Sequence, residues 1–212
     1  SCGDYYLTTE PHCPLCHDTT IVKHVPAKPN TLLYLHANLT EPMMGEGHAC
    51  GLVNHARSVG YTPDSLAKNL MLCNKNLNIA PFEDKDINIL YNIADVNLTT
   101  SVGEGCGLSL LEASATKTTS IAPNNSAMPE QLGGSGHLIR NCGFVSPAHD
   151  NGFLRPVPHI PSIVDALATE YTKWQLNNFT KVLNDKAYKH IKHNHRWEPQ
   201  RDRMAKAIKE NI

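Results

Sequence analysis

The chain has 212 residues, of which 41% are hydrophobic and 18% are charged, and its formal net charge at pH 7 is −1. This composition is typical of a soluble globular protein and excludes a largely disordered chain. A charge near zero argues against a nucleic-acid partner, because such proteins usually carry a basic surface. No apolar run reaches the length of a membrane span, so no transmembrane segment is expected.

Cysteine usage indicates the cellular compartment. The seven cysteines are an odd number and lie scattered along the chain. A disulfide framework usually has an even number of regularly spaced cysteines. We therefore predict a reducing environment and a cytoplasmic location.

Residues 1–30 are predicted to be an irregular lead-in that is rich in Cys, His and Pro. Cys13 and Cys16 have the spacing of half a zinc site, and His17 extends them to the Cys-x-x-Cys-His pattern of covalent haem attachment. No second well-spaced pair is apparent. The simplest interpretation is a loop with free thiols, and a small zinc-containing interaction protein is the alternative from another class.

The segment that follows the lead-in is expected to begin an alternation of strands and helices. Residues 31–37 are rich in apolar side chains and predict a buried strand. Residues 41–47 are expected to form a loop. Four residues at helical spacing then indicate a helix that ends at Gly60, and these are Leu52, His55, Ala56 and Val59.

The alternation continues up to residue 94. Asp64 and Ser65 are expected to cap a short turn before a third strand at 70–73, and residues 74–81 form the loop at its carboxyl end. Acidic residues at 83–86 complement the dipole at the start of the next helix. The buried stripe of that helix is expected to consist of Ile87, Leu90, Tyr91 and Ala94.

A strand, a glycine-rich turn and a helix are predicted between residues 94 and 115. Val96 and Leu98 alternate with polar residues, as in a strand. Three glycines then allow a tight turn and a close approach by a ligand, and these are Gly103, Gly105 and Gly107. The helix is expected from about Cys106, with its apolar positions at Leu108, Leu111 and Ala115.

Such a turn aims free N–H groups and the positive end of the helix dipole at its occupant. A phosphate or another anion would suit it, and an ordinary strand-to-helix connection is the alternative. Glu104 in the turn and Glu112 on the helix are poor partners for a phosphate but good acceptors for sugar hydroxyls. The pair therefore suits a ligand with a phosphate between two sugars.

The remaining elements follow in order. Residues 118–122 predict a strand, and a polar loop at 124–127 precedes Pro129, which suits the first turn of a short helix. Residues 137–145 and 150–161 are expected to form short strands and loops.

Three helices are expected after residue 161. The first has Ser162 near its cap, the second carries apolar positions from Phe179 to Ile191, and the third spans 198–212. The nearby histidines at positions 190, 193 and 195 are interpreted as solvent-exposed rather than as metal ligands.

Strands that alternate with helices imply an α/β fold, with a Rossmann-like parallel sheet and helices on both faces. We predict one such domain over residues 31–212, including the C-terminal helices, after the lead-in at 1–30.

An ordered set of motifs resembles the C-terminal domain of GT-B glycosyltransferases, and more narrowly the retaining group 1, family 4-like enzymes with a Glu-x7-Glu motif. The resemblance covers roughly residues 85–212 and is weaker from about residue 30. It is carried by LYNIADV at 90–96, GEGCGL at 103–108, LEA at 111–113, TTSIA at 118–122, MPE at 128–130 and RWE at 196–198.

The resemblance implies a domain that binds a nucleotide-diphosphate sugar and transfers the sugar with retention. Glu104 would be the catalytic residue that holds hydroxyls of the donor sugar, and Glu112 would accept hydrogen bonds from the ribose. The backbone N–H groups of Gly105, Cys106, Gly107 and Leu108 would face the diphosphate. No metal or other cofactor is implied.

The acceptor, which is a glycan, a lipid or a protein, would come from an N-terminal domain that is expected to lie outside these residues. Two departures from the pattern stand out. In the family, an Arg and a Lys usually neutralise the diphosphate, but residues 1–30 contain no matching pattern of these residues. Cys106 also stands where the family usually has an aromatic residue. A non-catalytic nucleotide-sugar-binding domain or partner subunit is therefore the alternative.

Overall fold

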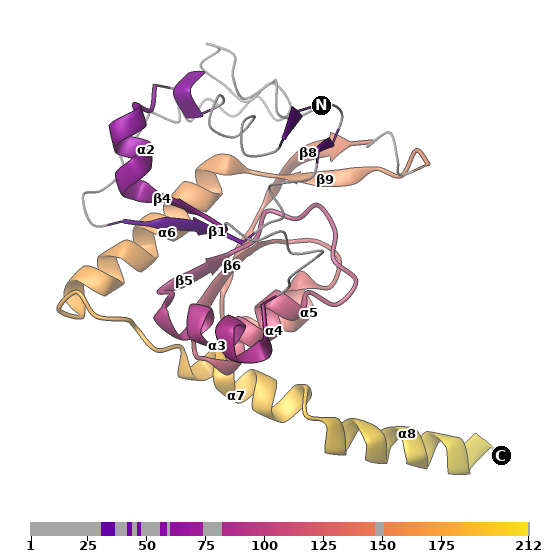
Figure 1. The fold of residues 1–212 in the computed structure, drawn as a ribbon. Coiled ribbons are helices and arrows are strands. Elements are labelled where there is room, and N and C mark those ends of the chain that lie inside the picture. Colours follow the sequence, from indigo (N-terminus) through magenta and orange to yellow (C-terminus); the bar gives the residue numbers. More distant parts are fainter. Residues whose placement is uncertain are drawn as a thin grey trace. The chain divides into compact units, whose positions relative to one another are not determined.

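The computed structural model describes residues 31–36, 42–43, 46–47, 56–58, 60–73, 82–146 and 151–211 (Figure 1). The predicted lead-in at 1–30, the helix positions before residue 56 together with Val59, and the loop at 74–81 lie outside these residues. The chain divides into two compact units, Ser1–Asp84 and Lys85–Ile212, and each is described by itself.

The first unit contains a two-stranded parallel sheet. Strand β1 (Leu33–Leu35) pairs with β4 (Leu70–Leu72), so both predicted strands are present. The predicted burial of the first strand was wrong, because Leu33 is 50% exposed and no residue of β1 is buried. Two short strands, β2 (Pro42–Met43) and β3 (Glu46–Gly47), pair antiparallel within the predicted loop. Gly60 has a φ of +97°, which ends the helical residues 56–58 as expected.

Helix α2 (Pro63–Asn69) replaces the short turn that we expected before β4. Its N-cap is Thr62, whose side-chain oxygen accepts a hydrogen bond from the Ser65 backbone N–H. Pro63 at the first helical position is pre-organised for this start. The predicted cap at Asp64 and Ser65 was therefore misplaced by two residues, because these residues lie inside the helix.

The second unit is built on a three-stranded parallel sheet in the order β5-β6-β7. The strands are β5 (Val96–Leu98), β6 (Thr119–Pro123) and β7 (His137–Ile139). Helix α3 (Asp84–Ile93) precedes β5, α4 (Leu108–Ala115) connects β5 to β6, and α5 (Met128–Leu132) connects β6 to β7. This order confirms the predicted alternation.

Side chains of β6 divide the core into two clusters. Ala122 packs with Leu110, Met128 and Leu132, which come from α4 and α5. Ile121 packs instead with Ile139 and with Ala166 of helix α6 (Ile160–Leu176). Because neighbouring strand residues point to opposite faces, helices cover both faces of this sheet. The α/β, Rossmann-like fold class predicted from the sequence is therefore confirmed.

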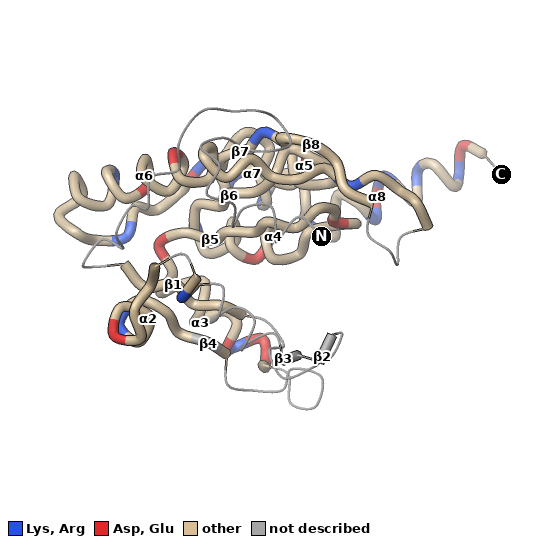
Figure 2. The backbone as a smooth tube through the Cα atoms, turned by 90° about the horizontal axis from the view of Figure 1, so that it is seen from above, with Lys and Arg blue, Asp and Glu red and all other residues tan. Residues whose placement is uncertain are grey.

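The C-terminal part adds an antiparallel hairpin and three helices (Figure 1). Strands β8 (Asn141–Val145) and β9 (Arg155–Pro158) form the hairpin, in which Val145 lies opposite Arg155. After α6 come α7 (Asp185–Asn194) and α8 (Trp197–Asn211). Figure 2 shows basic and acidic residues interspersed along α8. Among the described residues, no helix has both the length and the apolar character needed to cross a bilayer.

The structure refines three predicted helix details in this unit. The buried positions of α4 are Leu110, Ala113 and Ser114, whereas Leu108 is 64% exposed. The cap of α6 is His159, whose ring accepts a hydrogen bond from the Ser162 backbone N–H. Helix α7 begins only after its cap residue Asn184, so Phe179, Val182 and Leu183 precede it, whereas Tyr188 and Ile191 lie within it.

Candidate functional site

The glycine-rich turn lies at the carboxyl edge of the parallel sheet, between the end of β5 and the start of α4. Gly107 is the N-cap of α4, with φ 71° and ψ 53°, and it provides no side-chain hydrogen bond to the helix. The first N–H groups of a helix have no partner within the helix. The start of α4 therefore keeps donors, and the positive end of its dipole, for an anionic ligand.

Loop residues after β6 hold the turn from one side. Because β5 and β6 are parallel, the loops that follow them meet at the same edge of the sheet. The Glu104 backbone N–H donates to the Ser126 hydroxyl oxygen over 2.9 Å. That hydroxyl lies 3.1 Å from the Asn125 side-chain oxygen, to which it donates. The position of Glu104 is thus set by a polar loop 22 residues away in sequence.

Two further elements reach the turn. Gln131 of α5 aims its side-chain nitrogen at the Cys106 sulfur, over 3.9 Å. Arg155 of β9 lies against Gly103, where a Cβ atom added to the glycine would be 3.0 Å from the Arg155 Nη1 atom. Gly103, Glu104 and Cys106 are therefore each approached by a polar side chain from a different segment of the chain.

Buried polar atoms without partners cluster at this edge of the sheet. The Asn125 Nδ2, Gln131 Oε1 and Asn141 Oδ1 atoms have no hydrogen-bond partner among the described residues. Asn141 belongs to the same group, because its Nδ2 atom donates to the Asn124 carbonyl over 3.0 Å. Orphaned buried polar atoms are costly in a folded protein. A ligand with hydroxyl or phosphate groups would supply partners for such atoms.

The predicted site residues fall into two groups. Glu104, Gly105, Cys106, Gly107 and Leu108 lie together in the turn and at the first position of α4. Gly107 is buried, Glu104 is half-buried, and the other three are exposed. The turn thus presents most of these residues at the surface.

Glu112 lies one helical turn beyond Leu108 and interacts with α3. Burial, and after it the neighbouring Glu112 carboxylate, raise the pKa of the Tyr91 hydroxyl on α3. The structure therefore places the two glutamates of the predicted pair differently. Glu104 belongs to the turn, whereas Glu112 lies on α4 beside α3.

Sequence reasoning missed four side chains at this site, namely Asn125, Ser126, Gln131 and Arg155. The polar loop after β6 was recognised, and its place after a parallel strand was a usable signal for a ligand-facing position. Arg155 lies 52 residues beyond Gly103 on a hairpin, and nothing local in the sequence indicates their contact.

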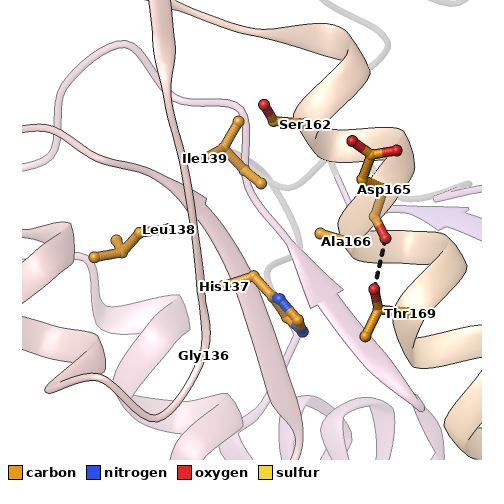
Figure 3. A pocket seen from close by; sticks show the side chains of 8 residues that line it. All are labelled: Gly136, His137, Leu138, Ile139, Ser162, Asp165, Ala166 and Thr169. Atoms are coloured by element: carbon orange, nitrogen blue, oxygen red, sulfur yellow. Dashed lines mark hydrogen bonds between the residues drawn. The ribbon is translucent and has the colours of Figure 1, made fainter.

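A shallow groove of about 380 Å³ lies elsewhere, between β7 and α6 (Figure 3). None of the predicted site residues lines it. The side chains of His137 and Thr169 in its lining are already paired: His137 Nε2 lies 2.6 Å from Glu170 Oε1, and the Thr169 hydroxyl donates to the Asp165 carbonyl over 2.8 Å. Lys173 also donates to Glu170 Oε1, over 2.6 Å. The groove is therefore a weaker candidate for the active site than the turn.

The cysteines and histidines that were considered as metal ligands lie partly outside and partly inside the described residues. Cys13, Cys16 and the adjacent histidines lie outside the described residues. Among the residues that are described, no three His, Cys, Asp or Glu side chains are grouped so that they could hold a metal ion. His190 and His195 do lie close together, with ring centroids 5.4 Å apart. Burial, and the neighbouring His190, lower the pKa of His195.

Gly107 is required by its backbone conformation, which gives a stability prediction. Replacing it with alanine should lower the free energy of unfolding by about 1–2 kcal/mol, because a Cβ is disfavoured at positive φ. Urea denaturation measures this change. Gly105→Ala is the matched control, since nothing lies within 4 Å of its added Cβ. Equal effects of the two substitutions would contradict the assignment to backbone strain.

Comparison with known proteins agrees with this geometry. The model of the family described as glycosyl transferases group 1 matches residues 59–168. The match includes the turn, α4 and the loop after β6. A comparison with curated proteins gave no match. Because the family model covers just over half of the chain, the protein belongs to the group 1 glycosyl transferases, which transfer sugars.

Proposed function

We propose that the second unit binds the nucleotide-diphosphate sugar of a retaining glycosyltransferase, as the donor half of a GT-B fold with a Glu-x7-Glu motif. The observation that carries this proposal is the turn that opens α4 through Gly107 at the carboxyl edge of a parallel sheet. In open α/β sheets this edge is where ligands bind. Membership in the group 1 family supports sugar transfer as the chemistry.

The diphosphate is assigned to the start of α4. Gly105, Cys106, Gly107 and Leu108 contribute backbone N–H groups there, and Gly107 carries no side chain that would obstruct a close approach. Fixed N–H dipoles stabilise negative charge without reorganising during the reaction. We therefore assign charge stabilisation to the protein, and the proposed reaction needs no metal ion.

The two glutamates are assigned to the sugars on either side of the diphosphate. Glu104 accepts hydrogen bonds from the donor sugar, and its backbone is positioned by Ser126. Glu112 accepts hydrogen bonds from the ribose. A carboxylate has about four acceptor sites, so Glu112 can bind ribose while it stays beside Tyr91.

In the proposed reaction, the bond between the sugar C1 and the diphosphate oxygen breaks, and its electron pair leaves with the diphosphate. A hydroxyl of a glycan, lipid or protein acceptor forms the new bond to C1 on the same face. Its proton passes to the departing diphosphate oxygen. The acceptor is presented by a second domain, in this chain or in a partner.

The donor is identified by thermal denaturation with UDP-, GDP- and ADP-sugars. One class is expected to raise the unfolding midpoint of the protein, because a ligand that binds only the folded state stabilises it by mass action. The shift should persist in EDTA. If no nucleotide-sugar shifts the midpoint, donor binding is refuted.

Product analysis separates transfer from binding alone. Incubation with the stabilising donor and simple acceptors should give a product, or a hydrolysed sugar, with the anomeric configuration of the donor, as read by NMR. An inverted product would contradict retention. Stabilisation without turnover would instead favour the non-catalytic nucleotide-sugar-binding domain or partner subunit.

A further inference from the structure

Arg155 is placed at the glycine-rich turn by the β8–β9 hairpin. It is the first residue of β9, and it lies opposite Val145 of β8. A Cβ atom on Gly103 would lie 3.0 Å from Arg155 Nη1 and 3.8 Å from Cζ. The guanidinium therefore packs against the turn backbone at a separation that the missing side chain of Gly103 permits.

A second observation marks the same turn as a ligand site. Gln131 is only 7% exposed, its Nε2 atom points at Cys106, and its Oε1 atom has no partner among the described residues. The Asn125 side chain is linked to the Glu104 backbone through the Ser126 hydroxyl. Its buried Nδ2 atom also has no hydrogen-bond partner among the described residues. Two side chains that contact the turn or its supporting loop thus keep unused hydrogen-bonding capacity.

Two other cations of this unit form hydrogen bonds away from the turn. The Arg140 guanidinium donates to the His159 ring over 3.0 Å. The Lys181 ammonium donates to carbonyls at the end of α3, over 2.9 Å to Tyr91 and 3.0 Å to Asn92. Arg155 differs from both, because its guanidinium lies against the turn to which the diphosphate is assigned.

We propose that Arg155 binds the diphosphate of the donor, and this inference rests on the proposed function. A guanidinium presents five N–H donors in a planar fork that matches phosphate oxygens. Arg155 would hold one edge of the diphosphate while the N–H groups at the start of α4 hold the other. This cation thus comes from the β8–β9 hairpin.

The test compares nucleoside diphosphates with nucleosides. Calorimetric titration of the whole chain with UDP, GDP and ADP identifies the base, and the matching nucleoside lacks the diphosphate. Arg155→Gln should weaken binding of the diphosphate roughly 10- to 100-fold, as expected for lost hydrogen bonds to a charged group, and leave the affinity for the nucleoside unchanged. The affinity of Arg155→Lys for the diphosphate should lie between those of the unmodified protein and Arg155→Gln, because lysine keeps the positive charge but not the planar fork of donors.

Arg203→Gln is the matched control, since it removes the same charge from the exposed helix α8 and should bind like the unmodified protein. If Arg155→Gln binds the diphosphate normally, the role of Arg155 is overturned while donor binding stands. Loss of diphosphate and nucleoside binding together would show a structural role and also overturn it. If the unmodified protein binds none of the three diphosphates, the proposed function itself fails.

A measurement on the unmodified protein covers the case in which Arg155→Gln does not fold. Phenylglyoxal modifies arginine side chains, and peptide mass spectrometry locates each modified residue. The bound nucleoside diphosphate should slow modification of Arg155 and leave that of Arg203 unchanged. Equal modification of Arg155 with and without the diphosphate would refute the contact.

Discussion

Replacing Glu104 with glutamine should lower the rate of sugar transfer about 100-fold or more while leaving the affinity for the nucleoside diphosphate unchanged. Glutamine keeps the size of the side chain and its hydrogen-bond acceptor but removes the negative charge. The transition state of glycosyl transfer has positive charge on the sugar ring, which a carboxylate stabilises and an amide does not. The nucleoside diphosphate lacks this sugar, so its binding should not depend on Glu104.

The position of Glu104 makes this a local change. Its backbone N–H is bonded to the Ser126 hydroxyl over 2.9 Å, and this bond does not involve the carboxylate. The turn should therefore keep its conformation in the variant. Initial rates with radiolabelled donor give the transfer rate, and calorimetric titration gives the affinity for the diphosphate.

Glu210→Gln is a suitable control, because it removes an exposed carboxylate at the end of α8. This variant should transfer sugar at the unmodified rate. A Glu104→Gln protein with normal turnover would show that Glu104 has no catalytic role. Loss of diphosphate affinity in the same variant would point to a disturbed turn instead of lost charge stabilisation.

The succession of β5, the glycine-rich turn and α4 could be predicted because the sequence signals for these elements are local. Val96 and Leu98 alternate with polar residues, and glycines mark the turn that follows. Pro129 likewise predicts the start of α5, where it lies in the first turn. In these segments the sequence period, the turn residues and the helix start all indicate the same structure.

The buried face of α4 could not be read from its sequence in the same way. Its residues LSLLEASA are apolar or small at most positions, so two stripes fit helical spacing about equally well. The packing of Leu110 against Ala122, Met128 and Leu132 selects one of them. That choice depends on tertiary contacts, and these also override local propensity elsewhere.

The residues that contact the candidate site could not be predicted from the sequence, because their contacts also depend on the tertiary fold. Arg155 meets Gly103, and Tyr91 meets Glu112, only because the sheet brings distant segments together. His159 was missed as the cap of α6 because histidine is not among the usual cap residues. Its ring nitrogen nevertheless lies within hydrogen-bond distance of the Ser162 backbone nitrogen, at 3.3 Å.

Replacing Lys181 with methionine should lower the free energy of unfolding by about 3 kcal/mol without weakening nucleotide binding. The Lys181 ammonium donates to the Tyr91 and Asn92 carbonyls, and over 2.7 Å to the hydroxyl of Thr118, which is fully buried. Methionine keeps the apolar stem but removes all three of these hydrogen bonds, although the Tyr91 carbonyl still accepts one from the Thr118 hydroxyl over 2.7 Å. Thr118 directly precedes β6, so the lost contacts lie at the amino edge of the sheet, opposite the glycine-rich turn.

Chemical denaturation of the two proteins measures the difference in stability, and nucleotide titration checks the site. Lys189→Met, at an exposed position on α7, should change stability little. Thr118→Val provides a double-mutant cycle with Lys181→Met. Because both substitutions break the same contact, their combined effect should be smaller than the sum of the separate effects. Strict additivity would show that the Lys181–Thr118 bond contributes nothing.

The pH dependence of the stability lost in Lys181→Met independently tests whether Lys181 and Asp95 interact. Burial raises the pKa of Asp95 above its ordinary 3.8, and the Lys181 charge opposes this rise. Without Lys181 the folded-state pKa of Asp95 rises further, so the folded variant binds more protons than its unfolded form as the pH falls toward 3.8. Stability linked to Asp95 is then present at low pH and is lost as the pH rises through the folded-state pKa. The deficit should therefore be larger at pH 7 than at acid pH, and a deficit independent of pH would exclude any coupling between Lys181 and Asp95.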